Sequence, residues 1–309
     1  MNIFSFIIFA TSLLFVESKN LRSNNEGKIC NNLALSGGGS FGMVEVGILS
    51  DLYDKGKIPY SFDVITGISA GGLNTGFLSY YNNISIGVKD LYEVYKNMNN
   101  DKVYERELLK IMSEWSIYNT APLYKTLGSI IGSKKPINNG PIALIGASNV
   151  LKEKIDIFRF DELNVEDKVN VLMSTSAIPL VFPPHKFNGS LYVDGGVITN
   201  ELIYESLGYN DCTYYNILFI SALNHKENSN KVEGLFSYIS SVLHLIYSTF
   251  DYQLSELSKN KCNNPLGVIN ACFPNSEELS SYSILDFNNG EQLYNISKNN
   301  YYCINFDLC

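Results

Sequence analysis

A serine in a glycine-flanked pentapeptide is the strongest chemical signal in this chain. Ser69 is the centre of G-I-S-A-G at residues 67–71, between the apolar run 62–65 and a helix-like segment at 72–78. A serine on a sharp turn from strand to helix has its hydroxyl exposed at the carboxyl end of a sheet. The flanking glycines permit a strained backbone and the close approach of a substrate. The pattern predicts that Ser69 is a nucleophile.

A second glycine-rich turn could stabilise the negative charge that an attacking serine creates. Gly37, Gly38 and Gly39 lie between an expected strand at 32–36 and an expected helix at 44–52. Amide groups at the start of a helix are unpaired and favour negative charge, and glycine leaves room for a substrate. We expect these three amides to line an oxyanion hole.

The same glycines allow a competing interpretation. Gly37, Gly39 and Gly42 satisfy G-x-G-x-x-G after a strand and before a helix, as in dinucleotide-binding folds. Those folds place an acidic residue at the far end of the second strand, where it binds the ribose. Here Asp63 lies at the beginning of that strand and the far end carries Ser69. Dinucleotide binding is therefore disfavoured.

An aspartate at the end of an expected strand, 191–193, is a candidate for the base. Asp194 begins the sequence D-G-G at 194–196, and the glycines permit an exposed turn in contact with a neighbouring loop. A lone D-G-G is more often an ordinary turn with a capping aspartate. The assignment of Asp194 therefore depends on the serine and glycine motifs that accompany it.

A conventional triad would need one of the three histidines of the chain. His185 follows two prolines, and His244 points away from the apolar stripe of an expected helix. His225 lies in a polar loop after a late strand, and the order Ser69, Asp194, His225 matches that of the α/β-hydrolases. No motif surrounds His225, so these residues leave a triad open without requiring it.

Expected strands and helices alternate around the motifs, which indicates an α/β fold with parallel strands and right-handed crossovers. We expect a helical excursion over 80–140, a long amphipathic helix over 235–257 that covers the sheet, and a loop-rich tail beyond 259. No linker divides the chain, so the sequence predicts a single domain. The expected strands are 32–36, 62–65, 142–147, 191–193 and 217–222.

The N-terminal residues predict a route out of the cytoplasm. Residues 3–16 are almost wholly apolar, too short to span a bilayer comfortably, and Ser18 stands near a plausible cleavage point. We expect residues 1–18 to be a signal peptide, 19–309 to be the mature domain, and the protein to be secreted or to enter the secretory pathway. A net charge of −8 gives no attraction to nucleic acid.

The number of cysteines is also typical of a secreted protein. The chain has six, an even number, and four of them lie in the last fifty residues. In a secreted chain this pattern favours structural disulfides. Cys262 with Cys272 and Cys303 with Cys309 are the shortest closures, but the pairing cannot be deduced. The absence of C-x-x-C pairs and of nearby histidines argues against a zinc site.

Taken together, the motifs resemble those of the patatin-like phospholipases. The stretch 35–42 (L-S-G-G-G-S-F-G) is similar to that family's oxyanion loop, 67–74 to its nucleophile elbow, and 194–196 to its aspartate motif. Segments 119–123 and 174–184 are similar to weaker landmarks in the same order. The resemblance covers about residues 30–222, which leaves a C-terminal helix and a cysteine-rich tail at 223–309. Phe41 departs from the family, which often has Arg or Lys there.

The resemblance implies a three-layer fold and a reaction. Ser69 would be the nucleophile and Asp194 its base, in a dyad without histidine, with Gly37, Gly38 and Gly39 at the oxyanion. The expected activity is hydrolysis of acyl esters of phospholipids or related lipids through an acyl-enzyme, without metal or cofactor and with transient contact to a lipid surface. A triad with His225 and a non-catalytic lipid-binding or storage protein are the alternatives.

Overall fold

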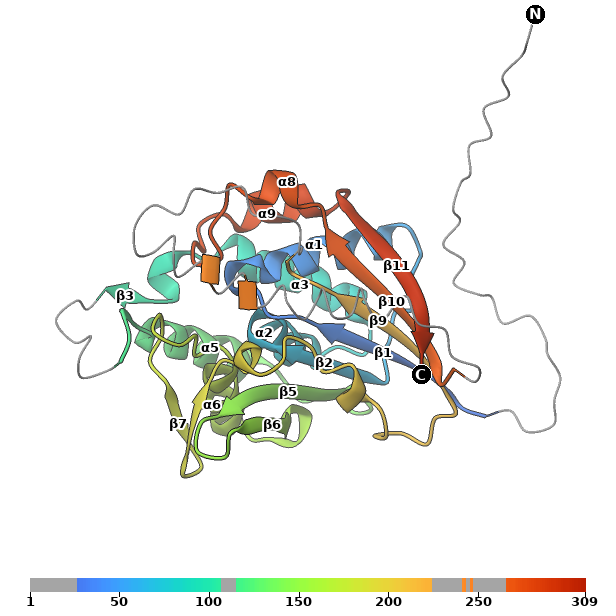
Figure 1. The fold of residues 1–309 in the computed structure, drawn as a ribbon, viewed down its shortest axis with the longest axis horizontal. Coiled ribbons are helices and arrows are strands. Elements are labelled where there is room, and N and C mark those ends of the chain that lie inside the picture. The colour runs from blue at the N-terminus through green and yellow to red at the C-terminus, as the bar shows by residue number, and fades with distance from the viewer. Residues whose placement is uncertain (1–26, 107–114, 224–240, 243–244, 247–264) are drawn as a thin grey trace, which may run out of the picture.

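The centre of the molecule is a mixed β-sheet. The computed structural model describes residues 27–106, 115–223, 241–242, 245–246 and 265–309 (Figure 1). In these ranges nine strands form one sheet in the order β11-β10-β9-β1-β2-β5-β8-β7, with β6 beside β5. The strands are β1 (Ile29–Leu35), β2 (Val64–Ile68), β5 (Ile142–Asn149), β6 (Lys154–Arg159), β7 (His185–Phe187), β8 (Ser190–Val193), β9 (Tyr214–Ile220), β10 (Gly267–Pro274) and β11 (Tyr301–Leu308).

The parallel strands in the middle of the sheet bring the sequence motifs to one edge. β10, β9, β1, β2 and β5 are mutually parallel, and Leu35 at the end of β1 pairs with Gly67 of β2 and with Ile220 of β9. Apolar residues dominate these strands because both faces of a parallel sheet are covered. The turns that follow β1 and β2 therefore lie side by side at the carboxyl edge.

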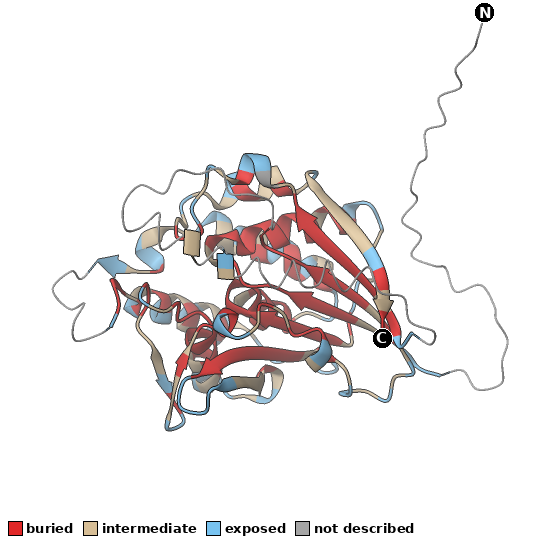
Figure 2. Cartoon of the chain, in the orientation of Figure 1, coloured by how far each residue is buried: buried red, intermediate tan, exposed pale blue. Residues whose placement is uncertain are grey.

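Helices pack on the sheet and bury its faces (Figure 2). Leu33 and Leu35 of β1 belong to a large core shared with the helices, whereas Ala34 between them faces a second core under Ile203 and Leu207. This alternation is typical of a strand that is covered on both faces of the sheet. The fold is therefore a three-layer α/β fold, as predicted. The helices are α1 (Gly42–Asp54), α2 (Ser69–Leu78), α3 (Ile84–Lys96), α5 (Ala121–Ser133), α6 (Val165–Thr175), α8 (Ser276–Leu279) and α9 (Gly290–Ser297).

The C-terminal region differs from the expectation. The prediction of a loop-rich tail beyond 259 is wrong for residues 265–309, because β10 pairs with β9 in parallel and β11 with β10 antiparallel. Polar Asn270 and the cysteines interrupt the apolar pattern of these strands and conceal it. The expected helix at 235–257 lies almost wholly outside the described residues, as does the expected signal peptide. In the described part of the chain, no helix is long and apolar enough to cross a bilayer.

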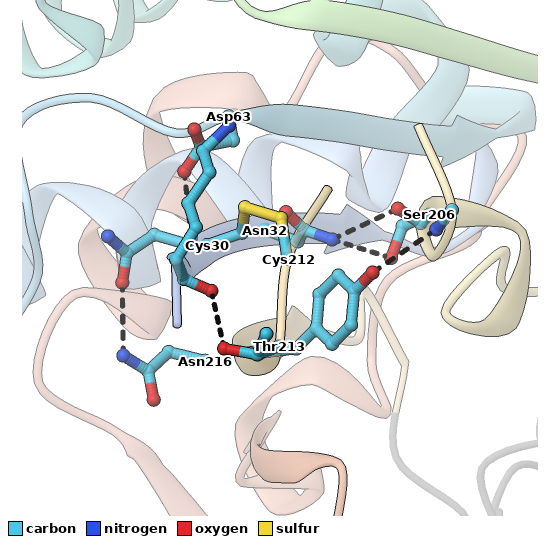
Figure 3. Close-up of a disulfide and its surroundings, with 11 residues drawn as sticks. Cys30, Asn32, Asp63, Ser206, Cys212, Thr213 and Asn216 are labelled. Atoms are coloured by element: carbon cyan, nitrogen blue, oxygen red, sulfur yellow. Dashed lines mark hydrogen bonds between the residues drawn. A yellow bond between two sulfur atoms is a disulfide. The ribbon is translucent and has the colours of Figure 1, made fainter. Parts of the chain in front are cut away.

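Two disulfides join strands to their surroundings. Cys30 in β1 pairs with Cys212 just before β9 (Figure 3), and Cys272 of β10 pairs with Cys303 directly opposite in β11. Disulfides were expected, but neither of the two shortest closures forms, because both would use Cys272 or Cys303. Cys262 lies outside the described residues.

The disulfides close loops of different length, and we expect different contributions to stability. The Cys30–Cys212 pair is separated by 182 residues and the Cys272–Cys303 pair by 31. A cross-link restricts the unfolded chain more when its loop is longer, so replacing each pair by alanine should lower the unfolding free energy by about 5 and about 4 kcal/mol, respectively. Urea denaturation of the two double variants measures both losses. A larger loss for the 272–303 pair would contradict this account.

Candidate active site

The turn between β2 and α2 holds Ser69 in a strained conformation. Ser69 is the first residue of α2 and has a φ of 51°, which is rare for a residue with a side chain. A Cβ atom on Gly67 would lie 2.2 Å from the carbonyl oxygen of Gly71, and one on Gly71 would lie 2.5 Å from the backbone of Leu35. The two glycines are therefore what allows this turn to pack against the end of β1.

The hydroxyl of Ser69 contacts a buried carboxylate. Ser69 Oγ donates a hydrogen bond of 2.6 Å to Asp194 Oδ2, and Gly196 N donates to the other carboxylate oxygen at 2.8 Å. Asp194 N in turn donates to the carbonyl of Ala177 at 2.9 Å. Asp194 is fully buried and Ser69 is 1% exposed. The structure thus brings together the two residues singled out as nucleophile and base, with the carboxylate oriented by the D-G-G turn.

The three glycines of the turn after β1 differ in what their amides contact. Gly37 N donates to Asn200 Oδ1 at 2.9 Å, and Asn200 Nδ2 donates back to Gly37 O at 3.3 Å. The amides of Gly38 and Gly39 donate no hydrogen bond to any described residue. The two amides that remain available for an oxyanion are therefore those of Gly38 and Gly39, while Asn200 holds the loop. The sequence offered no sign of this role for Asn200.

A buried threonine forms a hydrogen bond with the backbone of Ser69. Thr175 Oγ1, at the end of α6, accepts a hydrogen bond of 2.9 Å from Ser69 N and donates one of 2.6 Å to Gly146 O in β5. Thr175 is fully buried. The sequence marked Thr175 only as part of the segment 174–184 that resembles a family landmark, and it gave no sign of a contact with Ser69.

A polar network behind the site joins the glycine turn to α2. Glu45 of α1 is fully buried, and its carboxylate accepts hydrogen bonds from Ser36 N at 2.7 Å and from Asn74 Nδ2 at 2.8 Å. Tyr95 Oη donates to Asn74 Oδ1 at 2.8 Å, and burial, with a smaller effect of the charge on Glu45, raises the pKa of Tyr95. The network ties the end of β1 to three helices.

An apolar cavity adjoins the serine. It encloses about 790 Å³, its open mouth included, between α2, α3, α5 and α6. Its walls are almost entirely hydrocarbon, a composition that suits an acyl chain and excludes a charged ligand from the interior. It is lined by Gly39, Ser69, Ala70, Leu73, Asn74, Phe77, Leu91, Val94, Tyr95, Met98, Val103, Leu123, Leu127, Ile130, Ile131, Leu172, Ser176, Ile178, Phe182 and Phe287.

Comparison with known proteins agrees with this geometry. The family model described as "Patatin-like phospholipase" matches residues 33–205, more than half of the chain. The chain belongs to the patatin-like phospholipase family. The matched residues include the glycine turn, the serine elbow and the aspartate motif, and they end before β9.

Individual relatives of this patatin-like chain come from viruses, plants and bacteria. It is 26% identical over 289 residues to "Probable lipid hydrolase 463L" of Invertebrate iridescent virus 6, with 88% of this chain and 90% of the relative covered. It is 28% identical to "Patatin-like protein 4" of Arabidopsis thaliana over 59% of this chain and 52% of the relative. It is also 28% identical to a "cGAMP-activated phospholipase" of Escherichia coli (strain TW11681), over 57% of this chain and 54% of the relative.

The competing interpretations of the sequence have different outcomes in this patatin-like fold. His185 Nε2 lies 3.0 Å from Asn170 Oδ1, and burial lowers its pKa. His225 and His244 lie outside the described residues, so the triad is not tested. Asp63, which lies at the wrong end of its strand to bind a ribose, accepts a hydrogen bond from Asn31 N at 2.9 Å (Figure 3). Among the described residues no group of three or more His, Cys, Asp or Glu side chains could hold a metal ion.

We expect the Thr175 hydroxyl to contribute to stability. Replacing Thr175 by Val leaves the buried Ser69 N without its partner, which should lower the unfolding free energy by about 2 kcal/mol. Thr175→Ser keeps the hydroxyl and serves as the matched control, with a smaller loss from the missing methyl group. Urea denaturation measures both variants. Equal losses in the two would show that the hydroxyl contributes nothing.

Glu201, next to the loop-holding Asn200, should make stability depend on pH. Burial, reinforced by the charge of Glu205, raises the pKa of Glu201 to about 7 from an ordinary 4.5, although a hydrogen bond from Ile203 N opposes the shift. Between these values the folded state keeps a proton that the unfolded state has lost. The unfolding free energy should therefore fall, by up to about 3 kcal/mol, as the pH rises from about 4.5 to about 7.

Chemical denaturation at a series of pH values measures this dependence. Glu201→Gln should remove it, and Glu205→Gln should narrow the pH range by lowering the pKa of Glu201. If Glu201→Gln leaves the pH profile of the wild-type protein unchanged, Glu201 is not its source.

Proposed function

We propose that this chain is a lipid acyl hydrolase in which Ser69 attacks an acyl ester and Asp194 acts as its base. Membership of the patatin-like phospholipase family supports hydrolysis of lipids in general. The observation that carries the mechanism is the 2.6 Å hydrogen bond from Ser69 Oγ to Asp194 Oδ2. A serine is a weak nucleophile until a neighbouring base accepts its proton, and this carboxylate is the group placed to do so.

In the first half of the reaction, Ser69 Oγ attacks the ester carbonyl carbon while its proton moves to Asp194 Oδ2. The resulting oxyanion would be stabilised by the amides of Gly38 and Gly39, which have no other acceptor among the described residues. When the intermediate collapses, the bond to the leaving alcohol breaks and the alcohol takes the proton from Asp194. The acyl group remains as an ester on Ser69.

In the second half, water replaces the alcohol. Asp194 accepts a proton from the attacking water, the same amides hold the new oxyanion, and Ser69 leaves with the proton returned to its oxygen. The fatty acid is released and both residues are restored. The carboxylate of Asp194 accepts and returns every proton in this cycle, so proton transfer does not require a histidine.

The cavity supports a long-chain acyl group as the part of the substrate that is recognised. Its walls come from Leu, Ile, Val, Met and Phe side chains, and Ser69 lies among the lining residues. Burial of each methylene contributes about 0.8 kcal/mol, so a cavity of this kind favours fatty acyl esters over acetyl esters. The polar head group of the lipid would stay outside, at a membrane or lipid surface that the protein contacts transiently.

The location of the protein is part of the proposal. The apolar residues 3–16 and the disulfides Cys30–Cys212 and Cys272–Cys303 support entry into the secretory pathway, because disulfides persist in oxidising compartments. The lipid substrate would then be met outside the reducing cytosol.

The mechanism predicts the effect of two substitutions. Ser69→Ala removes the nucleophile and Asp194→Asn removes the base, so each should lower kcat for release of fatty acid from phosphatidylcholine vesicles by at least about 10³-fold. The wild-type protein should also be labelled covalently at Ser69 by a fluorophosphonate. Near-wild-type circular dichroism of both variants would show that they remain folded.

Two histidine variants complete the experiment. His185→Ala is a matched control, since the partner of His185 is Asn170, and it should stay within about twofold of wild type. His225→Ala should also keep kcat within about twofold of wild type if the enzyme uses a dyad. A loss of kcat comparable to that of Ser69→Ala would show that His225 completes a triad. A folded wild-type protein that neither releases fatty acid nor reacts with the fluorophosphonate would be a lipid-binding protein instead.

A further inference from the structure

A segment near the end of the described chain contacts the candidate active site. We call residues 283–288, between α8 and α9, the strap. It lies beyond the residues 33–205 that match the family, and it belongs to the connection from β10 to β11 (Figure 1). Its sequence, S-I-L-D-F-N, carries none of the motifs that pointed to an active site.

The strap first contacts the oxyanion loop. The carbonyl oxygen of Ile284 accepts a hydrogen bond of 2.8 Å from Ser40 N, and that of Ser283 accepts one of 3.0 Å from Ser40 Oγ. Gly39 has a φ of 59°, and a Cβ atom there would lie 2.2 Å from Ile284 O. The strap therefore packs against the backbone of the residue whose amide is proposed to hold the oxyanion.

The strap also contributes to the cavity. Phe287 is among the residues that line it, and its ring lies 6.2 Å from that of Tyr104 in an edge-on contact. Tyr104 Oη donates a hydrogen bond of 3.0 Å to Leu285 O, and the Tyr104 ring lies 6.0 Å from that of Phe182, which also lines the cavity. The strap thus contributes one lining residue, Phe287, to the cavity from outside the family match.

The side chain of one asparagine binds the strap through two hydrogen bonds. Asn100 Oδ1 accepts a hydrogen bond of 2.7 Å from Phe287 N, and Asn100 Nδ2 donates one of 3.1 Å to Asp286 Oδ1. The backbone of Asn100 adds a third contact, because its N–H donates to Asn288 Oδ1 at 3.3 Å. Asn100 therefore holds the part of the strap that carries Phe287, next to the carbonyls that contact Ser40.

We propose that the strap sets the acyl-chain preference of the enzyme and positions its oxyanion loop, with Phe287 as the specificity-determining residue and Asn100 as a positioning residue. The inference rests on the proposed function, because it concerns ester hydrolysis at Ser69. The basis of the proposal is that the strap contacts the oxyanion loop at Ser40 and also lines the cavity through Phe287.

The test of specificity compares chain lengths. Initial rates on p-nitrophenyl esters from butyrate to palmitate give a profile of kcat/KM, and Phe287→Ala should change the ratio between the longest and shortest esters by about tenfold in favour of longer chains. Phe287→Leu, which retains more bulk, should give an intermediate profile and guards against misfolding of the alanine variant. A merely structural role would lower all rates by one common factor.

The control for this test is another half-buried phenylalanine. Phe158 packs against Phe187 and Tyr192 and does not line the cavity. Phe158→Ala should therefore leave the chain-length profile unchanged, whatever it does to stability. A Phe287→Ala profile that coincides with those of wild type and Phe158→Ala overturns the assignment of Phe287.

The test of positioning uses the short ester. Asn100→Ala should lower kcat on p-nitrophenyl butyrate by about tenfold with KM nearly unchanged, because a displaced oxyanion loop weakens the transition state more than substrate binding. Asn97→Ala is the matched control, since among the described residues the Asn97 side chain bonds to Glu93 O of α3 and not to the strap.

The outcomes separate the two proposals. Ester hydrolysis that persists in Ser69→Ala contradicts the proposed function, and the role of the strap with it. Hydrolysis that depends on Ser69, with kcat in Asn100→Ala equal to that in Asn97→Ala, overturns the positioning role alone. A loss in Asn100→Ala that appears in KM rather than in kcat also overturns it.

Discussion

The strained backbone at Ser69 is the constraint on which the rest of the site depends. A residue with a side chain occupies the left-handed region here, at a cost of order 1–3 kcal/mol, only because its surroundings hold it there. Two glycines remove the steric conflict, Thr175 accepts the serine amide, and Asp194 accepts the hydroxyl. The parallel pairing of β1 with β2 then brings the glycine turn beside the same serine.

Burial gives the pair of Ser69 and Asp194 its chemical character. Both side chains are almost fully removed from water, so their hydrogen bond acts in a medium of low dielectric and is stronger than the same contact on a surface. The carboxylate remains satisfied through Gly196 N. The hydrocarbon walls of the neighbouring cavity keep the surroundings of the pair apolar.

The sequence was informative where local chemistry requires particular residues. A nucleophile turn needs glycine at fixed offsets, and a buried strand needs an apolar run, so β1, β2, β5, β8 and β9 and the residues Ser69 and Asp194 could be found without a structure. Asn200, Thr175 and Asn100 could not. Each acts through a partner at least 100 residues away along the chain, and nothing in its neighbours marks it. The pairing of Cys272 with Cys303 could not be deduced either, because the sequence did not reveal that β10 and β11 are neighbouring strands.

The late position of the strap and of β10 and β11 has a consequence for synthesis of the enzyme. A nascent chain contains the serine, the glycine turn and the aspartate once residue 196 has been made. The strap, which contacts the oxyanion loop and carries the cavity residue Phe287, is synthesised nearly a hundred residues later. The two strands on either side of it can pair only when β11 has been synthesised. Unfinished chains that end before residue 283 therefore contain Ser69 and Asp194 but lack the segment that contacts Ser40 and carries the cavity residue Phe287, so the complete site can form only after the C-terminal region has been synthesised.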